Sequence, residues 1–410
     1  MDSTETTHLL SPEKQLSVRL LHSFSEAEPH RTAWNDLVAR SGADVYQTFE
    51  WCSIWWKYYG TKRSLHLLFF YAGEDLVGIV PAFIETLWLG PVWIRAAKLV
   101  GADYSLTLCN LPVLPDFVKA VASQSVQYFV GKQRCDVLLF GPLAGSGAHI
   151  EDLQAAGLQN PTLVGETEAV GDTCNSIFAL PDNFADYLKN LDKKQRSNFK
   201  RMIEQSAKAH RVSFDSVGAP ETIATEFENF CREHEHQWRA DGKLGHFGDW
   251  PHAHEFNREL IRAFGSQGKV RFYRILADEK VISSQYCFVH GRTVYWRLPA
   301  RVRNAEWDRF SLGTMGLVKM IEAAIGEGLN TIEGGRGHYG YKVHHGAHEW
   351  PLRTVQFIRR GFGVRARVRL YKAFSSFLDF AYYKVLFVRL APKIPALQHT
   401  LWSFWIRHTL

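Results

Sequence analysis

The sequence contains little cysteine, and none of it is spaced as in a zinc or redox motif. Six cysteines are scattered through 410 residues, and no two of them form a C-x-x-C pair. They are Cys52, Cys109, Cys135, Cys174, Cys231 and Cys287. Scattered cysteines are typical of reduced, mostly buried thiols, so we expect a cytoplasmic protein without a disulfide framework.

A long apolar run and a secretory leader are also missing. No stretch of about 18 uninterrupted apolar residues occurs, so the sequence predicts no membrane-spanning helix. Residues 1–14 are acidic and polar where a secretory signal would be basic and then apolar. We expect this segment to be disordered, and the protein to be cytoplasmic or peripheral at the inner face of the membrane.

The net charge of the chain is small, but the charged residues are unevenly distributed. The chain carries +6, whereas residues 359–410 contain ten Lys or Arg and one acid, which gives this segment +9 and the remainder −3. A slightly acidic body without a recognised binding motif disfavours a nucleic-acid partner. The tail over residues 361–410 also contains Phe374, Phe377, Phe380, Tyr383, Phe387, Trp402, Phe404 and Trp405. It indicates either peripheral contact with an anionic membrane or a helix packed on the body.

The chain repeats one pattern of elements. Residues 65–84 and 270–289 each contain two apolar runs around an acidic turn, which predicts a β-hairpin. Each hairpin follows aromatic-rich helical sequence and precedes a helix and a strand. We therefore expect a duplicated α/β unit, each a mixed sheet flanked by helices, with domains over residues 15–165 and 166–360. Chance similarity of two hairpins is the alternative.

A candidate anion site lies where a helix is expected to begin, at Ser311. This residue can cap a helix over residues 311–328, and Gly313 and Gly316 leave its first turn open to close approach. Free backbone N–H groups and the helix dipole favour a phosphate at such a position. Arg309, just upstream, can supply a counter-charge.

Gly335, Gly337 and Gly340 form a G-x-G-x-x-G pattern, which on its own suggests a dinucleotide-binding turn. That motif requires a helix to open on the glycines, but Gly346 and Pro351 interrupt the sequence that follows. Because no such helix can begin at these glycines, we do not expect a Rossmann fold.

Five segments together resemble the CelD-like acyltransferases of the GNAT superfamily, which are related to Fem-type aminoacyltransferases. They are Q-T-F-E-W (47–51), V-G-I-V-P (77–81), D-K-K-Q-R-S-N-F-K-R (192–201), S-L-G-T (311–314) and E-G-G-R-G-H-Y-G-Y-K (333–342). The resemblance implies tandem GNAT-like domains and transfer of an acyl group, from acetyl-CoA or another acyl-CoA, to an amine or hydroxyl. The family is linked to cellulose and exopolysaccharide synthesis, which implies a small-molecule or polysaccharide-precursor acceptor.

The resemblance also implies where the donor binds. The GNAT pyrophosphate loop, Q/R-x-x-G-x-G/A, is only partly kept in R-F-S-L-G-T-M-G, so an aminoacyl-tRNA donor stays open as the alternative. The residues expected to hold the donor are Ser283, Ser284, Gln285, Arg309, Ser311, Leu312, Gly313 and Thr314.

Direct acyl transfer needs a base, an acid for the leaving thiolate and charge at the anionic groups. Glu333 or His338 can act as the base, Tyr341 as the acid, and Lys342 can bind an anionic group. A strand-end Glu333 paired with Arg336 is the structural alternative.

Lys194, Arg196 and Arg336 are expected to contact the substrate. Lys194 and Arg196 belong to a basic cluster in a predicted helix over residues 182–210, for which a solvated face is the alternative. We expect no metal, since His344, His345 and His348 lack partners at ligand spacing. A GNAT fold that has lost its chemistry and binds an anionic glycan is the competing class.

Overall fold

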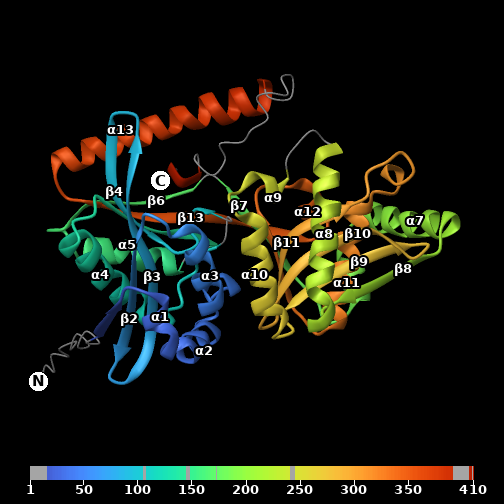
Figure 1. The fold of residues 1–410 in the computed structure, drawn as a ribbon, viewed down its shortest axis with the longest axis horizontal. Coiled ribbons are helices and arrows are strands. Elements are labelled where there is room, and N and C mark those ends of the chain that lie inside the picture. The colour runs from blue at the N-terminus through green and yellow to red at the C-terminus, as the bar shows by residue number, and fades with distance from the viewer. Residues whose placement is uncertain are drawn as a thin grey trace, which may run out of the picture.

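The computed structural model describes residues 16–104, 108–144, 148–171, 173–240, 245–390, 406–408 and 410. The segment expected to be disordered, residues 1–14, lies outside these ranges, and so do Trp402, Phe404 and Trp405. The described chain is a mixed α/β structure in which helices cover both faces of one long mixed sheet (Figure 1). This confirms the fold class expected from the sequence.

The first unit has five strands and follows the predicted order. Strands β1 to β4 are successively antiparallel, and β5 pairs parallel with β4 after a helical crossover. The strands are β1 (Ser17–Leu21), β2 (Ser64–Ala72), β3 (Asp75–Leu89), β4 (Val92–Leu99) and β5 (Val137–Ala144). The helices are α1 (Phe24–Ala27), η1 (Glu28–His30), α2 (Arg31–Ser41), η2 (Val45–Gln47), α3 (Phe49–Tyr59), η4 (Pro115–Phe117), α4 (Val118–Val126) and η5 (Gln127–Lys132).

The second unit repeats this arrangement. Strands β8 to β11 are successively antiparallel, and β12 pairs parallel with β11 after α11. The strands are β8 (Val212–Val217), β9 (Val270–Ala277), β10 (Lys280–His290), β11 (Thr293–Arg301) and β12 (Thr331–Arg336). The helices are α8 (Pro220–Ala240), α9 (His246–Asp249), α10 (Ala253–Gly265), η6 (Asp308–Phe310) and α11 (Leu312–Gly326). Both expected hairpins, β2–β3 and β9–β10, are present, and so is the expected duplication.

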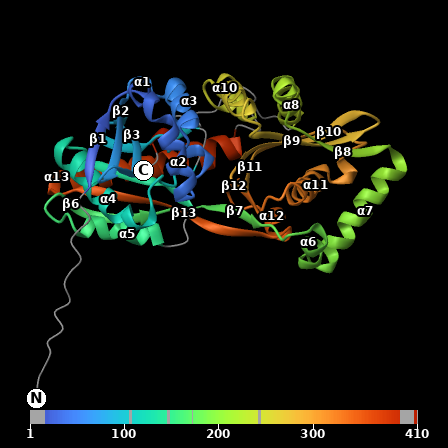
Figure 2. The ribbon, with the colours of Figure 1, turned by 90° about the horizontal axis from the view of Figure 1, so that it is seen from below.

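The remaining elements connect the two units. Strand β13 pairs with β7 at its beginning and with β5 and β6 further along, so the sheet runs without a break from β1 to β8 (Figure 2). These elements are α5 (Ala148–Leu158), β6 (Val164–Val170), β7 (Cys174–Ala179), α6 (Phe184–Asn190), α7 (Lys193–Ala209), α12 (Gly340–His344), β13 (Ala347–Arg359), α13 (Phe362–Leu378) and η7 (Asp379–Leu390).

Two strands lie at the division expected from the sequence, which stays a prediction. The boundary at residue 165 falls inside β6, and β13, which was assigned to the second domain, also completes the sheet of the first. The single helix expected over residues 182–210 is two helices, because Asp192 starts a new one by accepting a hydrogen bond from the Gln195 amide at 2.8 Å.

A shared aromatic core fuses the units. The ring of Trp51, on α3 of the first unit, lies 6.0 Å from Phe256 and 5.2 Å from Phe288 of the second. All three side chains are buried. Aromatic pairs of this geometry add to the free energy gained by burying their area, so the core favours one fixed arrangement of the two units.

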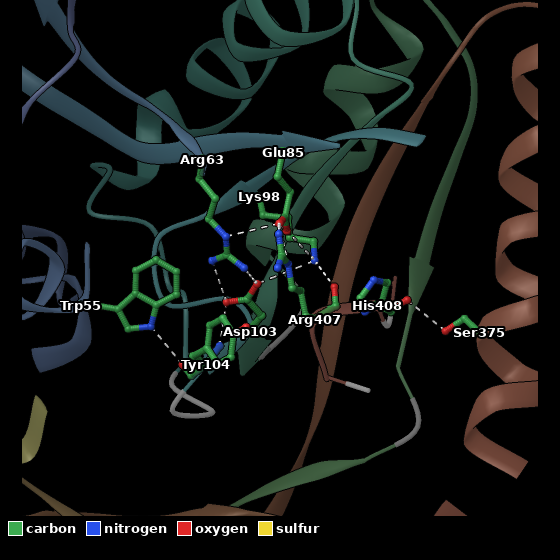
Figure 3. Close-up of polar contacts among 9 residues, drawn as sticks. All are labelled: Trp55, Arg63, Glu85, Lys98, Asp103, Tyr104, Ser375, Arg407 and His408. Atoms are coloured by element: carbon green, nitrogen blue, oxygen red, sulfur yellow. Dashed lines mark hydrogen bonds and ion pairs between the residues drawn. The ribbon is translucent and has the colours of Figure 1, made fainter. Parts of the chain in front are cut away.

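The described part of the tail packs on the first unit. Arg407 forms an ion pair with Glu85 at 2.8 Å, and its carbonyl accepts a 2.6 Å hydrogen bond from Lys98 (Figure 3). Arg63 pairs with Asp103 at 2.8 Å in the same buried group. Burial acts to raise the pKa of Asp103, but Arg63 and Lys98 outweigh it and lower that pKa. Because each of these buried charges has an opposite partner, the C-terminal residues are fixed against the sheet.

Strand β12 approaches β7 closely at Gly334, where the pairing shifts register between Glu333 and Arg336. A Cβ at Gly334 would lie 2.9 Å from Phe178 Cε2 and 3.0 Å from the Ser176 carbonyl oxygen. Gly334→Ala should therefore lower the free energy of unfolding by about 1–3 kcal/mol, the usual effect of overpacking. Urea unfolding followed by circular dichroism measures the change.

Gly326→Ala on α11 is the matched control, because a Cβ at that position meets no atom within 4 Å. This variant should unfold at the same urea concentration as the parent or at a slightly higher one. Equal destabilisation by the two substitutions would contradict the close approach of β12 to β7.

Candidate active site

Strands β11 and β12 separate part of the way along their length. Their parallel pairing covers residues 293–295 of β11 and ends where Tyr295 faces Glu333. Strand β11 continues to Arg301, paired with β10 alone among the described strands. The separation leaves a backbone edge to which an extended ligand can hydrogen-bond.

A cavity of about 600 Å³ lies beside this edge, within the usual size range of small-molecule sites. Residues of β10, of the second half of β11 and of the first turn of α11 form its wall. The residues lining it are Gln237, Ser283, Gln285, Trp296, Pro299, Ala300, Arg301, Val302, Arg303, Trp307, Asp308, Ser311, Leu312, Gly313, Thr314 and Tyr341. The structure thus brings together Ser283, Gln285, Ser311, Leu312, Gly313, Thr314 and Tyr341 from the sequence-based set.

The start of α11 faces this cavity without a side-chain cap. Ser311 occupies the N-cap position with φ of 50° and makes no capping hydrogen bond, so its expected capping role is wrong. The amides of Thr314 and Met315 donate to the Ser311 carbonyl. The earlier N–H groups of this turn are left for solvent or for a ligand.

Arg301 supplies the positive charge at this helix start. A Cβ on Gly313 would lie only 2.9 Å from Arg301 Nη1, so the glycine allows the guanidinium to lie against the first turn. The Nε of Arg301 is buried without a hydrogen-bond partner among the described residues. A cation with an unused donor beside a helix N-terminus is suited to bind an anionic group.

Arg309, the counter-charge expected from the sequence, lies elsewhere. It is exposed, stacks 4.5 Å above the Phe310 ring and does not line the cavity. Ser284 does not line this cavity either; it lines a neighbouring cavity of about 570 Å³, which shares Ser283 and Arg301 with the first. The structure therefore does not place these two residues in the cavity.

Glu333 is buried at the point where the strands separate, with 4% of its surface exposed, and it does not line the cavity. Its carboxylate accepts a 2.7 Å hydrogen bond from the Tyr46 hydroxyl and a 2.8 Å bond from the Gly335 amide. Burial and the charge of Glu333 raise the pKa of Tyr46 well above its usual value, so this hydroxyl stays protonated and keeps donating. A residue of the first unit thus orients the carboxylate of the second.

Asp44, from the same turn of the first unit, is a second buried acid here. The Tyr295 hydroxyl donates to its Oδ1 at 3.3 Å, and its Oδ2 has no partner among the described residues. Burial and the nearby charge of Glu333 raise the pKa of Asp44 to about 7. A carboxyl group that titrates near neutrality in this position is suited to proton transfer.

Lys342 is buried and does not line the cavity. Its Nζ donates to the Gly334 carbonyl at 2.5 Å and lies 5.5 Å from the Trp296 ring, which does line it. Burial lowers the pKa of Lys342 to about 8, although Glu333 opposes the shift. The side chain is thus one layer behind the cavity wall. Tyr341 is in the wall itself, and burial raises its pKa to about 12.

His338 does not line the cavity, and its side chain is 75% exposed. Its Nδ1 lies 2.7 Å from Glu349 Oε1, and ligand atoms of these two residues and Cys174 lie within 4.8 Å of one another. Such a Cys, His and carboxylate set can hold a Zn²⁺ ion with an open fourth position. Because Cys174 lies far from His338 and Glu349 in the sequence, ligand spacing along the chain does not reveal this set.

The three residues expected to contact the substrate are also outside the cavity lining. Arg196 donates to the carbonyls of Leu188, Lys189 and Leu191, so it caps the end of α6 rather than reaching a ligand. Lys194 is exposed on α7, and Arg336 is half-buried in β12 opposite Asn175.

Sequence reasoning missed Asp44, Tyr46 and Arg301. Asp44 and Tyr46 lie just before the Q-T-F-E-W segment, in the other half of the repeat. Tyr46 is 287 positions away from Glu333 in the sequence, so no local pattern connects them. Arg301 ends a strand that also carries Arg297 and is followed by Arg303. This cluster of arginines at the end of a strand, just before a helix begins, is the sequence signal that could have identified Arg301.

Comparisons with known proteins agree with this description of the second unit. Residues 193–343 match a family model described as an acetyltransferase (GNAT) domain. A search of curated proteins gives no match. The second half of the chain is therefore similar to GNAT acyltransferases in both sequence pattern and fold.

FemX supports this fold at low identity, and two other solved structures align less well. FemX aligns with a TM-score of 0.56 and 11% identity, over 83% of this chain and 97% of FemX. The C-terminal domain (DUF2156) of a putative lysylphosphatidylglycerol synthetase from Agrobacterium fabrum gives 0.47 and 13%, over 87% and 97%. A tandem GNAT protein from the clavulanic acid biosynthesis pathway gives 0.40 and 11%, over 85% and 99%. The GNAT acyltransferase fold is shown, and the narrower CelD-like resemblance stays a prediction.

The titration of Asp44 gives a test by stability. Its pKa is raised from 3.8 to about 7, so between these values the folded state binds a proton that the unfolded state has lost. The free energy of unfolding therefore falls as pH rises through this window. Asp44→Asn removes the effect, so the stability of the variant relative to the parent should increase by about 2–3 kcal/mol from pH 5 to pH 8.

Urea unfolding at both pH values measures this difference. Asp36→Asn is the matched control, because Asp36 is exposed on α2. The difference in free energy of unfolding between this control and the parent should be small and the same at both pH values. An Asp44→Asn effect that does not depend on pH would contradict a buried, protonated carboxyl group.

Proposed function

We propose that this chain is an acyltransferase that takes an acyl group from an acyl-CoA, acetyl-CoA in the simplest case. The acceptor is an amine or hydroxyl of a small molecule or of a polysaccharide or envelope precursor. One observation carries the proposal: Arg301 and the open start of α11 lie at a cavity beside the edge that β11 exposes after it leaves β12. The site therefore combines an anion-binding end with a strand edge.

Coenzyme A matches both parts of the site chemically. Its diphosphate suits the α11 N-terminus and the unused donor of Arg301. Its pantetheine arm is an extended, amide-bearing chain that can pair with the free edge of β11 as an added strand would. The thioester would then lie toward the point where β11 and β12 separate, near Glu333.

The transfer step uses groups near that point. The acceptor nitrogen or oxygen attacks the thioester carbonyl carbon, a new C–N or C–O bond forms, and the C–S bond breaks. Glu333, fixed by Tyr46 and Gly335, orients the acceptor or takes its proton, with Asp44 behind it. Tyr341, neutral because burial raises its pKa to about 12, donates a proton to the leaving thiolate.

A second candidate uses an aminoacyl-tRNA as donor. The exposed cations of α7 favour it, because Lys193, Lys194, Lys200 and Arg201 all face solvent on one helix. Such a surface attracts a phosphate backbone, and this attraction weakens as salt concentration rises. Binding of acyl-CoA and of tRNA to the purified protein distinguishes the two donors.

Titration calorimetry with acetyl-CoA tests the donor site. We expect micromolar binding that Arg301→Ala weakens at least about tenfold, since a charge-assisted contact to phosphate is lost. Gly313→Asp should also weaken it, because a carboxylate would face the diphosphate. Coenzyme A without the acyl group should bind comparably if the diphosphate dominates.

Arg309→Ala is the control for charge, because Arg309 is an exposed arginine near α11 that does not line the cavity. Its affinity should match that of the parent. Absence of binding by the parent would reject acyl-CoA as donor and favour the tRNA alternative. Equal losses of acetyl-CoA affinity in the Arg301 and Arg309 variants would contradict the proposed binding of the diphosphate beside Arg301.

Glu333→Gln tests the chemistry separately from binding. It should leave acetyl-CoA affinity unchanged and lower turnover about 100-fold, the usual contribution of a positioned acid or base. Thiol release from acetyl-CoA with a panel of amines and amino sugars provides the assay. Unchanged turnover would exclude Glu333 from the reaction, and binding without turnover by the parent on any acceptor would favour a non-catalytic binder.

A further inference from the structure

Helix α13 exposes an apolar stripe to solvent. Phe362, Leu370, Phe377 and Phe380 are 83%, 50%, 67% and 58% exposed. Exposed Ala366 and Ala373 lie between them, so apolar residues recur every three or four positions. This spacing puts them on one face of the helix and of its continuation η7. We call these six residues the outer stripe.

The opposite face of α13 already has its partner. Val364, Val368 and Tyr371 are buried against the strands of the first unit. Ser375, on the same inner face, donates to the His408 carbonyl at 3.0 Å (Figure 3). Docking of the helix on the body therefore does not involve the outer stripe, and burial within the described chain does not explain its apolar character.

Positive charge borders the outer stripe. Arg365 and Arg369 each precede a member of the stripe by one position, which puts them along one edge. Arg365 has no acidic partner among the described residues, and Arg369 reaches Glu166 only at 3.4 Å on the surface. Other cations of α13 and η7 already have acidic partners: Arg367 pairs with Asp136, Lys372 with Glu168 and Lys384 with Asp379. Arg365 and Arg369 are therefore the charges that the stripe offers to a partner.

We propose that the outer stripe binds an anionic lipid bilayer, with α13 lying in the plane of the surface. Its phenylalanines enter the boundary between headgroups and acyl chains, while Arg365 and Arg369 contact lipid phosphates. The α-helical part has 17 residues, which gives about 25 Å of contact at 1.5 Å per residue. Within the described residues no helix has the length and hydropathy to cross a membrane, so the contact is peripheral.

A second copy of the chain fits the stripe less well. Packing two identical helices through it would bring Arg365 and Arg369 of both copies to the same interface. Like charges at such an interface oppose association, whereas anionic headgroups neutralise them. Charge complementarity therefore selects the bilayer.

Vesicle flotation of the full chain tests this surface. The parent should float with phosphatidylcholine vesicles that contain about one third phosphatidylglycerol, and much less with phosphatidylcholine alone. A Phe377→Ser, Phe380→Ser variant should lower the partition coefficient at least about tenfold, because two inserted rings are lost. Arg365→Gln, Arg369→Gln should lower it about fivefold for each arginine and reduce its salt dependence.

Leu158→Ser is the matched control. Leu158 is also an exposed apolar residue, but it is on α5, which packs on the opposite face of the sheet. This variant should float like the parent. Circular dichroism and unfolding midpoints should be unchanged in all variants, because every substituted side chain is exposed.

Three outcomes would overturn the proposal. The first is a parent chain that does not float with anionic vesicles, and the second is a stripe variant that floats as well as the parent. The third is a parent that sediments as a dimer, becomes monomeric in the stripe variant and does not bind vesicles, which would assign the stripe to a second copy.

Discussion

Backbone pairing along β13 holds the two halves of this protein in one arrangement. Its first residues pair with β7 and the remainder with β5 and β6, so the hydrogen bonds of the sheet continue from one unit into the other. Independent rotation of the units would break this ladder and the aromatic core around Trp51. Because the units are fixed, Asp44 and Tyr46 of one lie permanently at Glu333 of the other.

Buried charges occur in two different settings. At the docked C-terminal residues, Arg407, Glu85 and Asp103 belong to a group in which opposite charges alternate, so the charges offset one another. Near the divergence of β11 and β12, burial dominates instead: it raises the pKa of Asp44 and lowers that of Lys342. Groups with incompletely compensated charge are poised to exchange protons, and this supports our proposal that the chemistry takes place at the divergence.

Elements with a clear hydrophobic period were predicted well. The two hairpins and α11 appear where the sequence puts them, because alternation and helical spacing act locally. Individual cationic side chains were predicted poorly. Arg196 turns to the carbonyls that end α6, and Arg309 lies over Phe310, because a flexible side chain takes whichever neighbour the fold brings within reach.

The sequence by itself determined the repeated α/β unit, the place where α11 begins and the basic, aromatic character of the tail. Each of these properties depends on residues close together in the chain. Only the tertiary structure decided that Tyr46 holds Glu333, that Arg301 is the cation beside Gly313, and that one face of α13 stays exposed. These contacts join distant segments, and their geometry follows from the continuous sheet, which no local pattern encodes.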